Sequence, residues 1–110
     1  MYYENPDGVS AHTGFPNPAI DASLQGIDLN RLLIQNSAAT YFMRVTGGAW
    51  SKAGIFDNDV AIIDRAVSPR PNDLIIWVRQ DEFAVSPRHA LPEAAETWGV
   101  VTAIIRQLRT

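Results

Sequence analysis

The sequence predicts a mainly β fold with one short helix and an extended N-terminal arm. Three observations support this fold class. After residue 40, short runs of β-forming residues recur, with turn signals about every 8–12 residues. A single segment, residues 28–35, has the spacing of an amphipathic helix. The first 26 residues are rich in proline, glycine and small polar residues.

The arm is predicted over residues 1–26, where prolines and glycines interrupt every periodic pattern: Pro6, Gly8, Gly14, Pro16, Pro18 and Gly26. Proline fixes φ, removes a backbone donor and disfavours helix in the preceding residue. We therefore expect this arm to be ordered only where it lies on another surface, and residues 27–110 to form one β domain.

The helix is predicted to begin at Asp28, whose carboxylate can cap the first turn. Leu29, Leu32 and Leu33 follow at the i, i+3, i+4 spacing of one apolar face. Asn36 and Ser37 end the pattern. Two turns of helix are marginal alone, so packing must hold them.

The strands are predicted from their apolar and β-branched composition over residues 40–45, 60–64, 73–79 and 82–86. Gln80 and Asp81 separate the last two runs, the spacing of a hairpin with a two-residue turn. The final run, residues 98–108, is long enough to serve two sheets if it bends near Gly99.

Composition excludes several classes of protein. The 110 residues contain no cysteine, which rules out disulfide scaffolds and thiolate chemistry, and the net charge of −3 argues against bulk-charge binding to nucleic acid. No apolar run is long enough to span a membrane, and the N-terminus does not read as a secretion signal. We expect a cytoplasmic protein without a cofactor or metal. Eight of the nine basic residues are arginine, so Lys52 is the single candidate for a lysine base.

Two local patterns have a structural explanation. Asp57-Asn-Asp59 resembles the start of a calcium loop, but Ile62 and Ser68 stand where that loop needs Gly and Glu, so a turn before a buried strand is favoured. His12 and His89 have no acidic residue at ligand spacing and are interpreted as surface histidines.

The aromatic residues could form a base-stacking platform, but their arginine neighbours are scattered singly. Packing in the core or in a dimer is therefore favoured for this set: Tyr41, Phe42, Trp50, Trp77 and Trp98.

A family resemblance spans roughly residues 13–109. It lies in Gly14-Phe-Pro-Asn-Pro-Ala, in residues 26–35 (Gly-Ile-Asp-Leu-Asn-Arg-Leu-Leu-Ile-Gln) and in Ala39-Thr-Tyr-Phe-Met-Arg-Val, and it continues through residues 54–64, 72–76, 82–85 and 98–106. These stretches resemble the UmuD branch of the LexA/UmuD family of self-cleaving SOS proteins (peptidase family S24). The resemblance implies the β fold of the LexA and UmuD C-terminal domains.

The family's chemistry is a serine–lysine dyad that cuts a peptide bond in the protein's own N-terminal arm. The nucleophile stands in a Ser-Gly-Asp-Ser-Met motif, which here reads Thr46-Gly-Gly-Ala-Trp50 and places Ala49 at the nucleophile position. The lysine position matches Ser86, followed by Pro87. The resemblance therefore implies that both halves of the dyad are lost, that no catalytic residue remains, and that the family's scissile bond corresponds to Thr13-Gly14.

Two alternatives stay open. A working autopeptidase would have to use Ser51 or Ser86 as nucleophile, although Ser51 and the neighbouring Lys52 are poorly placed to form a dyad. A mixed-dimer regulator of an active UmuD would instead act through its partner, and Thr13-Gly14 could then be cut by that relative.

The resemblance further implies an accessory subunit of SOS mutagenesis that forms homodimers and binds a Y-family translesion polymerase subunit. Contacts with the RecA filament and the sliding clamp are implied as well, whereas sequence-specific DNA binding and a membrane are not. The candidate dimer and partner contacts lie in the C-terminal strand: Trp98, Val100, Ile104 and Ile105.

Overall fold

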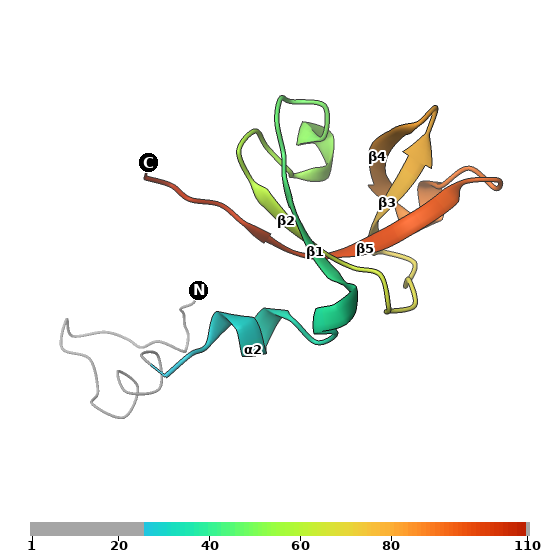
Figure 1. Ribbon diagram of the computed structural model, residues 1–110. Coiled ribbons are helices and arrows are strands. Elements are labelled where there is room, and N and C mark those ends of the chain that lie inside the picture. Colours follow the sequence, from blue (N-terminus) through green and yellow to red (C-terminus); the bar gives the residue numbers. More distant parts are fainter. Residues whose placement is uncertain (1–25, 110) are drawn as a thin grey trace. The chain divides into compact units, whose positions relative to one another are not determined.

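The computed structural model describes residues 26–109 (Figure 1). The chain divides after Leu32 into two compact units, Met1–Leu32 and Leu33–Thr110. Within the described residues, none of the helices has the length and hydrophobicity that crossing a membrane requires.

Helix α2 runs from Leu29 to Leu33. Asp28 caps it, since the Asp28 carboxylate accepts a 3.0 Å hydrogen bond from the backbone N–H of Asn30. The helix ends earlier than the predicted residue 35. Asn36 has a non-helical backbone (φ −130°, ψ 79°), and its side chain donates instead to Asp64 at 2.8 Å.

The described residues of the second unit form a five-stranded antiparallel sheet in the order β1-β2-β5-β3-β4. Its strands are β1 (Thr40–Arg44), β2 (Val60–Asp64), β3 (Leu74–Arg79), β4 (Glu82–Pro87) and β5 (Glu96–Ile105). Three 3₁₀ turns lie between them: η1 (Ser37–Ala39), η2 (Ser51–Ala53) and η3 (Arg88–Ala90). The mainly β fold and each predicted strand region are confirmed.

The hairpin turn between β3 and β4 is also confirmed. Gln80 and Asp81 both adopt positive φ, 53° and 65°, as the central residues of a type I′ turn do. The turn's twist matches that of the strands it joins, so it fixes the register in which Arg79 lies opposite Glu82.

Strand β5 occupies the centre of one sheet; it does not serve two sheets as the sequence suggested. Its N-terminal half pairs with β3 and its C-terminal half with β2, and the register shifts once against each neighbour. The shifts fall beside Trp98 and Thr102, the β5 residues that the Cα register leaves without a partner.

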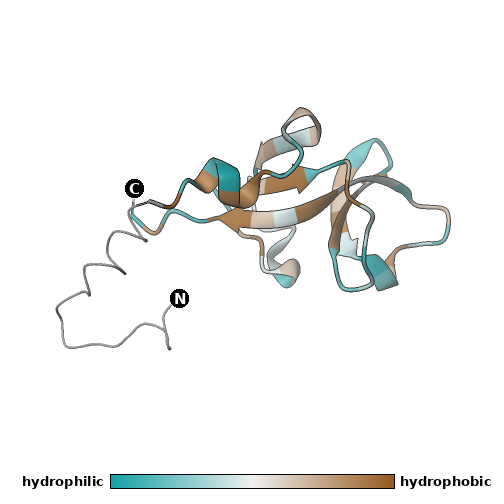
Figure 2. Ribbon diagram, turned by 90° about the horizontal axis from the view of Figure 1, so that it is seen from below, coloured by the Kyte–Doolittle hydropathy of each residue, from teal (hydrophilic) through white to brown (hydrophobic). Residues whose placement is uncertain are grey.

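Hydrophobic side chains cover both faces of the sheet, and the strands hold most of the hydrophobic colour in Figure 2. On one face, which we call face A, the buried cluster is Val45, Ile55, Ala61, Ile63 and Ile76. On the opposite face B it is Ile75, Trp77, Ala84 and Val100. Because successive strand residues point to opposite faces, two-sided burial explains why β3 is a continuous apolar run.

Candidate functional site

The segment that carries Ala49 is a loop closed at its base by two backbone hydrogen bonds. Val45 N–H donates to Asp59 O at 2.8 Å, and Asn58 N–H donates to Val45 O at 2.7 Å. Inside the loop, Gly47 N–H donates to the Asp57 carboxylate at 2.6 Å. These contacts explain the Asp57-Asn-Asp59 pattern as a turn, and Asn58 tolerates the φ of 73° that this turn requires.

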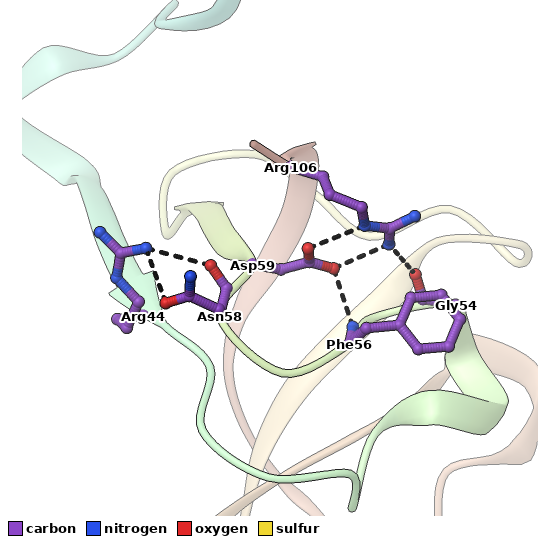
Figure 3. A network of polar contacts seen from close by, with 6 residues as sticks. All are labelled: Arg44, Gly54, Phe56, Asn58, Asp59 and Arg106. Atoms are coloured by element: carbon purple, nitrogen blue, oxygen red, sulfur yellow. Dashed lines mark hydrogen bonds and ion pairs between the residues drawn. The ribbon is translucent and has the colours of Figure 1, made fainter. Parts of the chain in front are cut away.

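An ion pair between Asp59 and Arg106 joins this loop to the end of β5 (Figure 3). Arg106 Nε and Nη2 each donate to one Asp59 oxygen at 2.8 Å, and Nη2 also donates to Gly54 O at 3.0 Å. Phe56 N–H donates to the same carboxylate at 2.8 Å, while the Phe56 ring lies 4.6 Å from the guanidinium carbon. One bidentate pair therefore ties the Asp59 end of the loop to the residue that follows β5.

The electrostatics follow from these contacts. Hydrogen bonds from Arg106 and from Phe56 N–H lower the pKa of Asp59 from 3.8 to about 2, against the opposing effect of burial. The pKa of Asp64 is also lowered, chiefly by the hydrogen bond from Asn36. These carboxylates are structural anions, and neither is tuned to act as a proton acceptor near neutral pH.

Ala49 lines an open pocket of about 270 Å³. Its walls come from the end of β1, the loop and β4: Met43, Arg44, Val45, Thr46, Ala49, Trp50 and Phe83. Several of these residues pack against the face A cluster, so the pocket opens on face A. Neither serine nor lysine lines the pocket, and Thr46 supplies the side-chain hydroxyl among its walls.

Ser86 lies on the other face of the sheet. It pairs with Ile75, a member of the face B cluster, whereas its neighbour Val85 pairs with Ile76 and packs on face A. The side chain that reaches the Ala49 pocket from β4 is Phe83, two residues from Val85 on the same face. By strand phase, the Ser86 side chain therefore starts from the face of β4 opposite to Phe83 and Val85.

Ser51 and Lys52 begin the 3₁₀ turn η2 immediately after the pocket, and both are exposed. Ser86 Oγ donates to Pro87 O at 3.4 Å. Nucleophilic catalysis by a serine and a lysine requires a hydrogen bond between them. Within residues 26–109, no hydrogen bond joins a serine to Lys52.

An aromatic cluster borders the pocket on face A. The Trp98 ring lies 5.3 Å from Tyr41 and 5.0 Å from Phe83, centroid to centroid. The Arg65 guanidinium lies 4.4 Å from the Trp98 ring, and its Nε donates to Trp98 O at 2.7 Å. Trp77, by contrast, is buried in the core on face B.

The four candidate contact residues of the C-terminal strand differ in the face they occupy and in their exposure. Val100 is buried in the face B cluster, while Trp98 and Ile104 pack against the face A cluster. Ile105 alone of the four is an exposed large hydrophobic residue. Val100 therefore has no surface to offer a second protein in this structure.

Of the remaining candidates, His89 is exposed on η3, and His12, Thr13 and Gly14 lie outside the described residues. Residues 26–109 contain no cluster of His, Cys, Asp or Glu that could hold a metal ion.

Sequence reasoning missed two residues of this region. Arg106 lies 47 residues from Asp59 in the sequence, and no local pattern predicts that the two side chains pair. Phe83 could have been found by its strand phase, since β4 alternates between the two faces and Phe83 shares the phase of Val85.

Comparison with known proteins identifies relatives over most of the chain. The Peptidase S24-like family model matches residues 7–87. Protein SamA of Salmonella typhimurium (strain LT2) is 34% identical over an alignment 113 residues long, which covers 88% of this chain and 81% of SamA. Protein ImpA of Escherichia coli is 36% identical over 114 residues, with 87% and 79% covered. Protein MucA of Escherichia coli is 30% identical over 109 residues, with 81% and 75% covered.

Proposed function

Because this chain belongs to the Peptidase S24-like family, as a UmuD-like member related to SamA, ImpA and MucA, we propose that it is a catalytically inactive accessory protein of SOS mutagenesis. In this role it acts as a dimeric interaction subunit for a Y-family polymerase during translesion DNA synthesis. The observation that carries the proposal is Ala49, which stands at the family's nucleophile position and has no hydroxyl.

The geometry around Ala49 supports the loss of activity. A serine nucleophile needs a base within hydrogen-bond reach, and the position expected to supply it carries Ser86, which has no amine. Phe83 occupies the β4 side of the pocket, and its ring cannot accept a proton.

The Asp59–Arg106 pair and the backbone hydrogen bonds at the base of the Ala49 loop nevertheless hold this loop in place. A structured pocket that neither serine nor lysine lines suits recognition of another chain. Around it, Tyr41 and Phe83 are 45% and 43% exposed, and aromatic side chains of this kind are enriched at protein interfaces. We assign partner binding to this face A surface, with the polymerase subunit first and the RecA filament and sliding clamp as further partners.

The test of inactivity is intact mass over time at about pH 10, where roughly a quarter to a third of an ordinary lysine is neutral, with and without RecA filament on single-stranded DNA. We expect one unchanged mass in both conditions. A product that begins at Gly14 would contradict the proposal, and Ser51→Ala and Ser86→Ala would then identify the nucleophile.

The partner role is tested separately by co-purification of the full chain with a Y-family polymerase subunit. Trp98→Ala, which removes the centre of the aromatic cluster, should weaken that complex, whereas Leu108→Ala, at a side chain that is 92% exposed outside the cluster, should leave it unchanged. Equal binding by both variants would remove the face A surface from the proposal. Native mass spectrometry with an active UmuD-like protein would reveal mixed dimers, the signature of the regulator alternative.

A further inference from the structure

Strand β1 forms an open edge of the sheet. It pairs with β2 on one side, and among the described residues no strand lies on its other side. Folded proteins protect such edges with proline, lysine, inward charges or bulges, because an open edge is a template for another strand. The β1 sequence, Thr-Tyr-Phe-Met-Arg, contains neither proline nor lysine, and its register with β2 runs without a shift.

The opposite edge, β4, is protected. It ends at Pro87, which cannot donate to a further strand. Of the two edge strands among the described residues, β1 is the one without a proline.

Both sides of β1 also carry exposed aromatic surface. Phe42, which pairs with Ile62 and points to face B, is 61% exposed. Tyr41, which points to face A against Trp98, is 45% exposed. A strand added beside β1 would therefore gain hydrophobic contacts on both faces of the extended sheet.

We propose that β1 of one chain pairs antiparallel with β1 of a second copy, about a two-fold axis at Phe42. This arrangement deepens the dimer of the proposed function and rests on it. It joins the two sheets into one through a single isologous contact and gives partners to the outward backbone groups of both edges, apart from Thr40 N–H, which already donates to Ser37 O.

The sequence of β1 is complementary to itself in this register. Phe42 lies opposite Phe42 of the second copy, Tyr41 opposite Met43, and Thr40 opposite Arg44, so all five residues are paired. Aromatic and apolar residues meet across the strands, and the one charged residue faces a neutral threonine rather than a second arginine. A second copy thus supplies a matching edge that an unrelated peptide would match only by chance.

Disulfide trapping tests this arrangement cleanly, because the chain contains no cysteine. Opposed residues of antiparallel strands have Cα atoms about 4.5–5.5 Å apart, within the range that a disulfide spans. Under mild oxidation, full-length protein with Phe42→Cys should form a covalent dimer. Phe83→Cys is the matched control, an exposed phenylalanine on the other edge strand, and should remain a monomer under denaturing electrophoresis.

Sedimentation of unmodified and Phe42→Lys protein provides the second measurement. Two lysines facing each other across the axis should raise the dimer dissociation constant by about tenfold or more, whereas Phe83→Lys should leave it unchanged. Circular dichroism checks that both variants fold, which we expect because both positions are exposed.

The outcomes separate this interface from the proposed function. A dimer that persists with Phe42→Lys but dissociates with Ile105→Lys would overturn the β1 interface and place the contact on β5. The dimeric part of the proposed function would then stand. A protein that stays monomeric at all concentrations would overturn both the β1 interface and the dimeric part of the proposed function. Neither result bears on inactivity, which the intact-mass experiment measures.

Discussion

Two nitrogens of Arg106 donate hydrogen bonds of 2.8 Å to the carboxylate of Asp59, and this pair links the end of the central strand to the base of the Ala49 loop. The two residues differ in exposure, since the Asp59 side chain is 1% exposed and that of Arg106 is 42% exposed. Arg106 thus closes over a buried anion from the solvent side.

We expect Arg106→Met to lower Tm and to raise the pKa of Asp59 from about 2 toward its ordinary value, because the main cause of the lowered pKa is the hydrogen bond from Arg106. Thermal unfolding and an NMR titration of the Asp59 carboxyl carbon measure the two effects. Arg109→Met, at an exposed arginine, is the control and should change neither. An unchanged Asp59 titration would show that the pair does not set the pKa of this carboxyl.

Stability should fall in acid for the same reason. The folded-state pKa of Asp59 lies below its value in the unfolded chain, so the pair stabilises the protein fully above about pH 4, and this contribution is lost as pH falls toward about 2. Asp64, whose pKa is also lowered, adds to the same slope. Urea unfolding between pH 6 and 2 measures it. The Asp59→Asn variant should show a shallower acid dependence, and equal slopes would refute the assignment.

The close approach of β5 to β2 predicts a large cost for Gly99→Ala. A Cβ at this position would lie 2.6 Å from Cγ2 of Ile63, a buried core atom. Overpacking of this kind costs about 1–3 kcal/mol, which chemical denaturation will show. Gly48→Ala, where a Cβ meets no atom within 4 Å, should be nearly neutral; similar losses at both sites would contradict the packing argument.

The hairpin turn should accept stabilising substitutions. Gln80 and Asp81 hold positive φ without being glycine, a conformation that costs an ordinary L-residue about 1–2 kcal/mol. Asp81→Gly should therefore raise the free energy of unfolding, by less than about 1 kcal/mol, because Asp already tolerates this conformation better than most L-residues and glycine adds entropy to the unfolded chain. Asp73→Gly, outside the turn, serves as the contrast and should destabilise the protein, because the Asp73 carboxylate accepts a 2.7 Å hydrogen bond from Arg70 N–H.

Restoring one reacting group should not restore cleavage. Ala49→Ser places a hydroxyl in the face A pocket, yet no lysine lines that pocket. We expect the intact mass to stay unchanged at about pH 10.

The double variant Ala49→Ser with Ser86→Lys should also remain uncut, because the new lysine starts from face B. Release of a fragment ending at Thr13 would show that position 86 reaches the pocket, in disagreement with the β3–β4 register. Circular dichroism of the double variant distinguishes an inert fold from an unfolded chain.

Local sequence determined much of this protein. The strands, the two-residue turn at Gln80 and Asp81, and the capped start of the helix at Asp28 follow from periodicity, turn chemistry and capping, which act over a few residues. The sequence likewise predicts that no nucleophile hydroxyl is present at Ala49, because side-chain identity alone decides this.

Tertiary structure decided the rest. The position of β5 between β2 and β3, the pairing of Arg106 with Asp59 and the pairing of Ser86 with Ile75 all depend on strand register and on contacts between distant residues. A shift of one residue in register exchanges the two faces of a strand, so these relationships are set only when the whole sheet assembles.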